Sequence, residues 1–431
     1  MKEYDFVIIG NSAGGIGCIE TLRNLDADAS IAVISDEKYH TYSRALIPYY
    51  LDGKIEFDKM YYRPLDFYDR MRIDVFLGKR AVKIDFKNKV VELDDGESVS
   101  YGKLLLATGG KPFIPPIEGI DKKNVFTFVK MDDVLGIEKA VESAKKAVVL
   151  GGEVIGLMVS EVLRRKGLEV TVVELADRVL APVVDKTTSK MVEDIFRENG
   201  VKIITNNTIN KVVGETKVEG VILKDGTEIQ ADILIVGIGV VPRTELVKDT
   251  EVEVNRGIVV NTKMQTSVED VYACGDCAEV HDFLFNAKRP LPLWPVAYRG
   301  GMIAAYNMCG IDREYTHATA MNAMHFFDLY IINAGLNVAD DEEGYEIIKK
   351  FDSEKRIYRR FALKDGKIVG MILVGEVERA GIILNLMKNE VDVTSFKERL
   401  LDGNFGYADM PEELRWKLLC NDVILGVVRE Q

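Results

Sequence analysis

The chain has 431 residues, of which 47% are hydrophobic, with 56 lysine and arginine residues against 69 aspartate and glutamate residues. This length exceeds one ordinary core, so we expect two or three domains. The net charge of −13 repels phosphate groups, which argues against nucleic acid or an anionic membrane surface as a partner. No apolar run reaches the ~18 residues of a membrane span, and a strand stands where a secretory signal would, so we expect a cytoplasmic protein.

The five cysteines, at positions 18, 274, 277, 309 and 420, are too few and too dispersed for a disulfide framework. We therefore expect reduced thiols. Only Cys274 and Cys277 have the spacing of a ligand or redox pair, and the four histidines lie too far apart to form a local cluster. The sequence predicts no metal site.

The stretch YDFVIIGNSAGGIG, residues 4–17, predicts a buried strand, a tight turn and a helix that continues to Leu25. Gly10, Ser12 and Gly15 have the spacing of a GxGxxG dinucleotide-binding turn with serine at its middle position. Backbone N–H groups at such a helix start have no intrahelical partner, so they can hold a pyrophosphate. An ordinary strand-to-helix turn is the alternative.

The next predicted strand, residues 30–34, favours nucleotide binding. Asp36 follows this strand, where a dinucleotide-binding unit places the acid that bonds a ribose hydroxyl. A solvated acidic loop is the alternative for Asp36.

The chain then repeats this arrangement. Residues 147–150 predict a strand, residues 151–156 a second glycine turn, and residues 158–166 a helix. The following strand, residues 169–174, ends in Glu174, again an acid. The spacing from the glycine turn to the acid is nearly the same in both copies.

A second pair of segments, residues 90–110 and 220–239, also repeats. Each predicts a strand, an Asp-Gly turn, a strand and an apolar strand that ends in small residues. Two copies of a glycine turn followed by such a meander, in the same order, are stronger evidence for nucleotide binding than either turn alone.

These patterns predict an α/β fold with two Rossmann-like dinucleotide-binding domains and a C-terminal α+β domain. Prolines at 112, 115 and 116 predict a linker. The expected domains are residues 1–114 with 245–318, an inserted domain at 115–244, and a third domain at 319–431. Within the third domain we expect strands at 325–338, 344–349, 356–362 and 367–374, followed by helices from 377 to 401.

The chain resembles the FAD-dependent pyridine nucleotide-disulfide oxidoreductases over nearly its whole length. The resemblance rests on GNSAGG near the N-terminus, ATGG at 107–110, the turn at 151–156, GIGVVPRTEL at 237–246 and TSVEDVYACGDCAEV at 266–280. It implies FAD in the discontinuous first domain, NAD(P)H in the inserted domain and a homodimer interface in the C-terminal domain. Residues 326–329 and 363–381 look most like the NADH oxidase, rubredoxin reductase and nitrite-reductase flavin-domain subgroup.

The resemblance also implies cofactor-binding roles for individual residues. The predicted FAD-binding residues are Gly10, Ser12, Ala13, Gly15, Asp36, Arg44, Ala107, Thr108, Gly109 and Asp276. A helix starting near Cys277 would direct its positive end at the FAD phosphates. The predicted nicotinamide-cofactor residues are Gly151, Gly156 and Glu174, and the Glu174 carboxylate favours NADH over NADPH because it repels a 2′-phosphate.

Three departures from the family pattern define the subclass. Thiol-using relatives carry a redox cysteine where this chain has Ala45, and NADH peroxidases carry a histidine where it has Ala13. The positions of a lysine–glutamate pair found near the flavin in electron-transferring relatives align with Tyr49 and Met158. We therefore predict no catalytic side chain, because the chemistry belongs to the flavin.

Two further features leave alternatives open. Glu153 occupies the middle-glycine position of the second turn, so either its side chain points outward or nicotinamide binding is weak. Cys274 and Cys277 are interpreted as structural residues, with a redox disulfide as the alternative.

The leading hypothesis is an enzyme that takes hydride from NADH onto FAD and passes electrons to a redox protein, such as rubredoxin or an iron–sulfur protein. Direct reduction of oxygen to peroxide is the enzymatic alternative. A redox-sensing or scaffold flavoprotein is the alternative from another class, and Glu153 is the feature that supports it.

Overall fold

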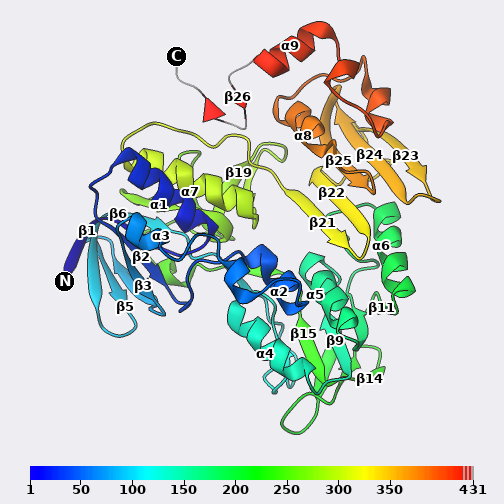
Figure 1. The fold of residues 1–431 in the computed structure, drawn as a ribbon, viewed down its shortest axis with the longest axis horizontal. Helices are drawn as coiled ribbons and strands as arrows, with labels where there is room; N and C mark the ends of the chain where they lie inside the picture. The colour runs from blue at the N-terminus through cyan, green and yellow to red at the C-terminus, as the bar shows by residue number, and fades with distance from the viewer. Residues whose placement is uncertain (421–422, 425–426, 429–431) are drawn as a thin grey trace. The chain divides into compact units, whose positions relative to one another are not determined.

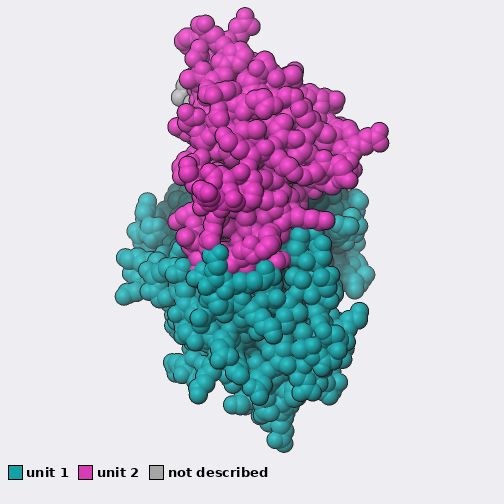
Figure 2. Space-filling view, turned by 90° about the vertical axis from the view of Figure 1, so that its right-hand side faces the viewer, with its two compact units in different colours: residues 1–180, 196–320 teal, residues 181–195, 321–431 magenta. Residues whose placement is uncertain are grey.

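The structure is a computed structural model that describes residues 1–420, 423–424 and 427–428. The chain forms two compact units, one of residues 1–180 and 196–320 and the other of residues 181–195 and 321–431 (Figures 1 and 2). In the described ranges no helix is both long and apolar enough to cross a membrane.

The first sheet of unit 1 is built around the N-terminal strand. Its order is β3-β2-β1-β6-β5-β4, with β18 beside β6. Strands β1, β2, β3, β6 and β18 run parallel, whereas β4, β5 and β6 form an antiparallel meander. The bounds are β1 Lys2–Ile9, β2 Ile31–Ser35, β3 Ile73–Leu77, β4 Ala81–Asp85, β5 Val90–Leu93, β6 Ser98–Leu106 and β18 Val271–Ala273.

Two helices, α1 (Ala13–Leu25) and α7 (Trp294–Met308), pack closely against each other in unit 1. A Cβ at Gly301 would collide with the Gly14 carbonyl oxygen, and a Cβ at Gly17 with that of Tyr298. The close approach of these helices therefore depends on glycine, and it fixes the start of α1.

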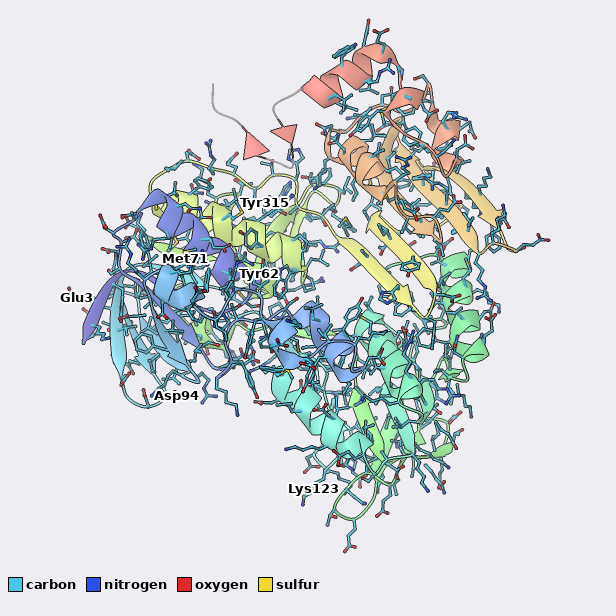
Figure 3. All side chains as sticks on the ribbon, viewed as in Figure 1. Glu3, Tyr62, Met71, Asp94, Lys123 and Tyr315 are labelled. Atoms are coloured by element: carbon cyan, nitrogen blue, oxygen red, sulfur yellow. The ribbon has the colours of Figure 1, made fainter. Side chains whose placement is uncertain are left out.

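The segment between β2 and β3 contains short helices, as expected for a covering loop: η1 Arg44–Leu46, α2 Ile47–Leu51, η2 Phe57–Met60 and α3 Phe67–Arg70. Tyr62, labelled in Figure 3, packs edge to face on Trp294 of α7 with ring centroids 4.8 Å apart. This contact ties the covering segment to the helix pair.

The second sheet of unit 1 is entirely parallel, in the order β11-β10-β9-β15-β8. Its bounds are β8 Val125–Phe126, β9 Lys146–Leu150, β10 Glu169–Val173, β11 Lys202–Ile204 and β15 Ile233–Val236, with helices α4 Met131–Val141 and α5 Val154–Arg165. Helix α6 (Lys186–Glu198) follows β10 in the chain, and most of it belongs to unit 2. The meander β12 Ile209–Val213, β13 Gly220–Leu223 and β14 Glu228–Gln230 forms a separate antiparallel sheet. The predicted α/β fold class is confirmed.

Both chain connections between the two sheets run side by side. Strand β7 (Gly110–Pro112) leaves the first sheet and pairs antiparallel with β16 (Val240–Pro242), which returns from the second. The predicted boundaries at 115, 245 and 319 stay predictions, and both parallel sheets lie in the same compact unit.

The prediction of a helix that starts near Cys277 is wrong. Gly275–Cys277 forms one 3-10 turn, η4, and the chain continues as β19 (Ala278–Asp282), between β17 (Ile258–Val259) and β20 (Ala287–Pro290). These pairings are made with residues distant in sequence, so they override the local pattern. The helix begins instead at Trp294, with Pro295 in its first turn, where proline is favoured.

Unit 2 contains an antiparallel sheet in the order β21-β22-β25-β24-β23, with α8 (Ala380–Lys388) packed on β25 and a further helix, α9 (Glu412–Cys420). The strands are β21 Met321–Phe326, β22 Leu329–Gly335, β23 Glu346–Asp352, β24 Ile357–Lys364 and β25 Lys367–Val374. The single strand predicted at 325–338 is a hairpin, because Phe327 turns the chain with a φ of 55°.

Candidate cofactor sites

The first glycine turn joins β1 to α1 and requires glycine at two positions. Gly10 has a φ of +127°, and a Cβ there would collide with the carbonyl oxygen of Ala107 at the end of β6. A Cβ at Gly15 would collide with the Gly10 carbonyl oxygen. The structure therefore brings Ala107 against the turn that contains Gly10 and Gly15, as the sequence predicts for residues of one cofactor site.

The N-terminus of α1 is open to an anion. Ser12 is the N-cap residue but makes no side-chain capping bond, and the first turn carries no acidic residue. The first N–H groups of a helix have no intrahelical partners and lie at the positive end of its dipole. Together with the glycine cradle, this end of α1 fits the pyrophosphate of FAD.

Asp36 is bonded by two cations. Lys130 Nζ lies 2.8 Å and Arg243 Nη1 2.9 Å from Asp36 Oδ2. Partial burial opposes ionisation, but these two partners lower the pKa of Asp36 to about 2. Asp36 is therefore a fixed carboxylate, in contrast to the solvated loop of the alternative interpretation.

Arg44 is half-buried beside the buried residues Glu37 and Tyr42. Its guanidinium pairs with Glu37, and its Nη1 donates to the Val129 carbonyl oxygen at 2.9 Å. Tyr42 donates its hydroxyl to Glu37 at 2.7 Å. Burial opposes the charge of Arg44, yet neighbouring Glu37 raises its pKa and Asp276 adds to this.

Asp276 lies half-buried in the 3-10 turn that follows β18. Burial raises the pKa of its carboxyl, and the positive charge of Arg44 partly offsets this effect. Nearby, Thr108 donates its hydroxyl to the Arg243 carbonyl oxygen at 2.9 Å, and Gly109 has a φ of 73° with open space beside it. Predicted FAD residues from three segments thus surround one region of unit 1.

The second glycine turn repeats the backbone geometry of the first. Gly151 has a φ of +113°, and a Cβ there would collide with the carbonyl oxygen of Gly237, which follows β15. A Cβ at Gly156 would collide with the Gly151 carbonyl oxygen. Glu174 accepts hydrogen bonds from the N–H of Gly152 at 2.6 Å and of Ala176 at 2.7 Å, so its carboxylate is fixed beside the turn.

Glu153 is exposed at the N-cap of α5 and makes no side-chain capping bond. Loss of hydration and the charge of Glu174 raise the pKa of the Glu153 carboxyl. A negative charge at this position opposes a pyrophosphate at the same helix end.

The two closely spaced cysteines are free, buried thiols. The Cys277 thiol donates to the carbonyl oxygens of Cys274 at 3.2 Å and Leu106 at 3.4 Å, and burial raises the pKa of both thiols. A Cβ at Gly14 would lie 2.7 Å from Cys274 Sγ, so this thiol packs directly under α1. Neither cysteine has the electropositive, accessible surroundings of a reactive thiolate.

Ala45 lies exposed in η1, and Tyr49 and Met158 lie on α2 and α5, which pack against each other. The described residues contain no cluster of side chains suited to a metal ion.

Sequence reasoning missed the partners of the predicted acids. Lys130 and Arg243 lie 94 and 207 residues from Asp36, and no local pattern selects them. Glu37, which pairs with Arg44, was not selected from the sequence either. Its position next to Asp36 was the one signal that could have identified it.

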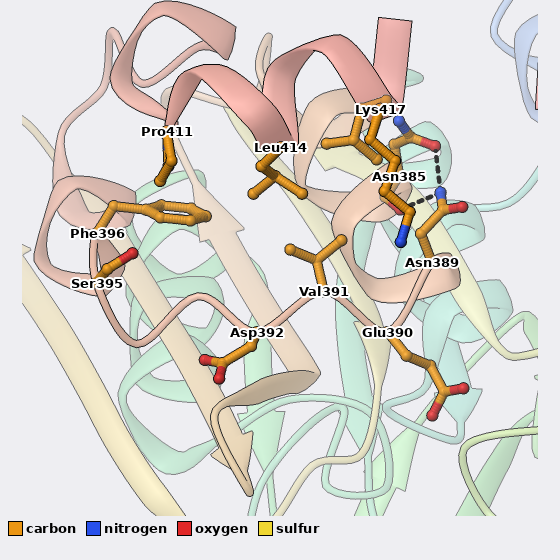
Figure 4. Close-up of a pocket in the computed structure, with 11 residues that line it drawn as sticks. Asn385, Asn389, Glu390, Val391, Asp392, Ser395, Phe396, Pro411, Leu414 and Lys417 are labelled. Carbon is orange, nitrogen blue, oxygen red and sulfur yellow. Dashed lines mark hydrogen bonds between the residues drawn. The ribbon is translucent and has the colours of Figure 1, made fainter. Parts of the chain in front are cut away.

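A cavity of about 390 Å³ lies in unit 2, between α8 and α9 (Figure 4). None of its lining residues was selected from the sequence, and Asn385 and Asn389, which bond to each other there, belong to the same helix end.

Comparison with known proteins gives matches over both units. Residues 4–301 match the family model "pyridine nucleotide-disulphide oxidoreductase", and residues 321–391 match "rubredoxin NAD+ reductase C-terminal domain". The NADH-dependent phenylglyoxylate dehydrogenase subunit epsilon of Aromatoleum evansii is 32% identical over 93% of this chain and 95% of its own length. An NADH oxidase of Methanocaldococcus jannaschii is 33% identical over 93% of this chain and 94% of its own.

Among solved structures, the covalent putidaredoxin reductase–putidaredoxin complex has a TM-score of 0.84 at 26% identity, covering 97% of this chain and 98% of that one. Some other curated relatives are longer proteins, of which this chain spans about half.

Proposed function

The chain belongs to the pyridine nucleotide-disulphide oxidoreductase family, and from that premise we propose that it passes electrons from NADH through FAD to a redox protein, a rubredoxin or an iron–sulfur protein. It is an FAD-dependent NAD(P)H oxidoreductase, as its family and homologues are. Bound FAD takes up an electron pair as hydride and can release electrons singly. NADH as the preferred donor and a one-electron protein as the acceptor belong to the proposal.

The observation that carries this proposal is the lack of a usable thiolate among the described residues. Ala45 stands at the position of the family's redox cysteine, and Cys274 and Cys277 are buried thiols with raised pKa values. A disulfide substrate needs an attacking thiolate, whereas transfer to a one-electron acceptor does not. The match of residues 321–391 to a rubredoxin reductase domain supports the same acceptor class.

The acceptor is tested by NADH-driven reduction assays on FAD-loaded enzyme. We expect ready reduction of ferricyanide and of a purified rubredoxin or iron–sulfur protein, with slow or absent reduction of coenzyme A disulfide and hydrogen peroxide. A Cys274→Ser, Cys277→Ser double variant should keep electron transfer to the protein acceptor. Robust disulfide reduction that this double variant abolishes would overturn the proposal.

Direct reduction of oxygen to peroxide is the second candidate, supported by the similarity to an NADH oxidase. Oxygen uptake and peroxide release, compared with protein-acceptor reduction in the same buffer, separate the two. An oxygen rate that exceeds the protein-acceptor rate would favour the second candidate.

A scaffold or sensor flavoprotein would behave differently from either enzyme. Stopped-flow mixing with NADH should bleach the flavin absorbance within seconds if the protein is an oxidoreductase of the proposed kind. A yellow protein that is indifferent to NADH would instead favour the scaffold hypothesis, in which Glu153 blocks the second turn.

A further inference from the structure

Asp36 is held by residues from outside the segment that it belongs to. Lys130 is the N-cap residue of α4, and Arg243 follows β16 on the return connection. Both lie in the segment 115–244 that we predict to bind NAD(P)H, whereas Asp36 lies in the segment that we predict to bind FAD. The three side chains retain 26–30% of their exposed surface, so water screens their charges only in part.

The two cations bind the same oxygen of the Asp36 carboxylate. Lys130 Nζ and Arg243 Nη1 both contact Oδ2, and within the described chain no group donates a hydrogen bond to Oδ1. A carboxylate oxygen has two lone pairs, so Oδ1 is left to accept from a ligand. This arrangement fixes one half of the carboxylate and keeps the other available.

The main chain of both cationic residues is also fixed. The Arg243 N–H donates to the Gly109 carbonyl oxygen at 2.9 Å, and the Arg243 carbonyl oxygen accepts from the Thr108 hydroxyl at 2.9 Å. The Lys130 N–H donates to Asp133 Oδ2 at 3.0 Å. The cations therefore approach Asp36 from backbone positions that are set in advance, which lowers the entropy lost when a ligand binds.

We propose that Lys130 and Arg243 are positioning residues for FAD, which orient the Asp36 carboxylate so that its free oxygen accepts a ribose hydroxyl. The proposal rests on the proposed function, because it takes FAD as the ligand of Asp36. It makes FAD affinity depend on two residues of the segment predicted for the other cofactor.

The first test is titration of the apoprotein with FAD, followed by flavin fluorescence. Lys130→Gln and Arg243→Gln should each weaken FAD binding roughly tenfold, since each removes a charge-assisted hydrogen bond. Lys111→Gln is the matched control, because Lys111 lies on the neighbouring strand β7 and pairs with Glu245 instead of Asp36. Its FAD affinity should equal that of the unaltered protein.

The second test asks by a double-mutant cycle whether Lys130 and Arg243 act on FAD through the Asp36 carboxylate or independently of it. In an Asp36→Asn background, Lys130→Gln and Arg243→Gln should cause little further loss of FAD affinity, because they act through the Asp36 carboxylate. In the protein that keeps Asp36, Arg243→Lys retains the positive charge and should bind FAD more tightly than Arg243→Gln. Circular dichroism establishes that each variant is folded, and if a double variant does not fold, the affinity that Arg243→Lys restores relative to Arg243→Gln decides the test.

Unchanged FAD affinity in both single variants would overturn the inference. Equal losses with and without the Asp36→Asn substitution would overturn it as well, since Lys130 and Arg243 would then affect FAD binding independently of the Asp36 carboxylate. Failure of the unaltered protein to bind FAD would overturn the proposed function itself.

Discussion

The two glycine turns share one backbone design but differ in charge. Gly10 and Gly151 both take a positive φ against a carbonyl oxygen of a neighbouring strand end, and Gly15 and Gly156 both lie against the carbonyl oxygen of the first glycine. At the middle position the first turn has Ser12 and the second has an exposed glutamate.

The acids that follow the second strand of each unit also differ. Asp36 is bonded by Lys130 and Arg243, which come from distant segments, whereas Glu174 accepts from the backbone N–H groups of Gly152 and Ala176. The comparison indicates that glycine sets the shape of each turn, while the charged residues around it set how strongly it holds a dinucleotide. Each prediction below changes one of these features in one turn and uses the other turn as its reference.

The largest effect is expected from adding a methyl group to the shared glycine position. Gly15→Ala should destabilise the protein by about 1–3 kcal/mol and abolish FAD retention, because the new Cβ overlaps the Gly10 carbonyl oxygen. Gly156→Ala should lose NADH-dependent flavin reduction while it retains FAD. Flavin absorbance, thermal unfolding and stopped-flow reduction measure these effects.

Gly381 is the matched control, because a Cβ there has open space and the residue lies in α8 of unit 2. Gly381→Ala should retain both FAD and NADH reactivity. If Gly156→Ala releases FAD as readily as Gly15→Ala does, the two turns do not bind separate cofactors.

The next largest effect is expected at Asp276, a residue of the first site only. Asp276→Ala should weaken FAD binding at least tenfold, since a half-buried acceptor beside the cofactor disappears. The KM for NADH of the remaining FAD-loaded enzyme should not change. Unchanged flavin content in this variant would show that Asp276 does not contact FAD.

A smaller effect, on cofactor choice, is expected at Glu174. Glu174→Ala should lower kcat/KM for NADH roughly tenfold and narrow the preference for NADH over NADPH, because the ribose acceptor and the repulsion of a 2′-phosphate are both lost. Arg178 is paired with Asp177 at 2.8 Å in the structure. A preference of the unaltered enzyme for NADPH would mean that Arg178 governs this pocket instead.

Local patterns predicted the parts of these sites that depend on adjacent residues. The strand–turn–helix units, the glycine positions and the acids at strand ends are all encoded within about 30 residues each. The partners of Asp36 were not predictable, because Lys130 and Arg243 meet it only after the two sheets are joined by β7 and β16. The helix expected near Cys277 failed for the same reason, since β19 is stabilised by pairing with β17 and β20.

The smallest effect is expected from the charge that distinguishes the second turn. Glu153→Gly restores the middle glycine, and Glu153→Gln removes the charge but keeps the size of the side chain. Both should lower the KM for NADH about threefold, because a carboxylate at the N-terminus of α5 repels the pyrophosphate that the helix end would otherwise attract. Ser12→Gly, the equivalent change in the first turn, should leave this KM unaltered.

The pH dependence of NADH binding tests whether charge or size is responsible. Partial loss of hydration at the carboxyl and the charge of the nearby Glu174 raise the pKa of Glu153, so its neutral form becomes populated at a higher pH than for an ordinary glutamate. As the pH falls through this raised pKa, the repulsion disappears and NADH should bind the unaltered enzyme more tightly. Glu153→Gln has no such group and should lack this increase. If both proteins show the same increase, another residue carries the charge, and if Glu153→Gly alone lowers the KM, the size of the side chain is the obstacle.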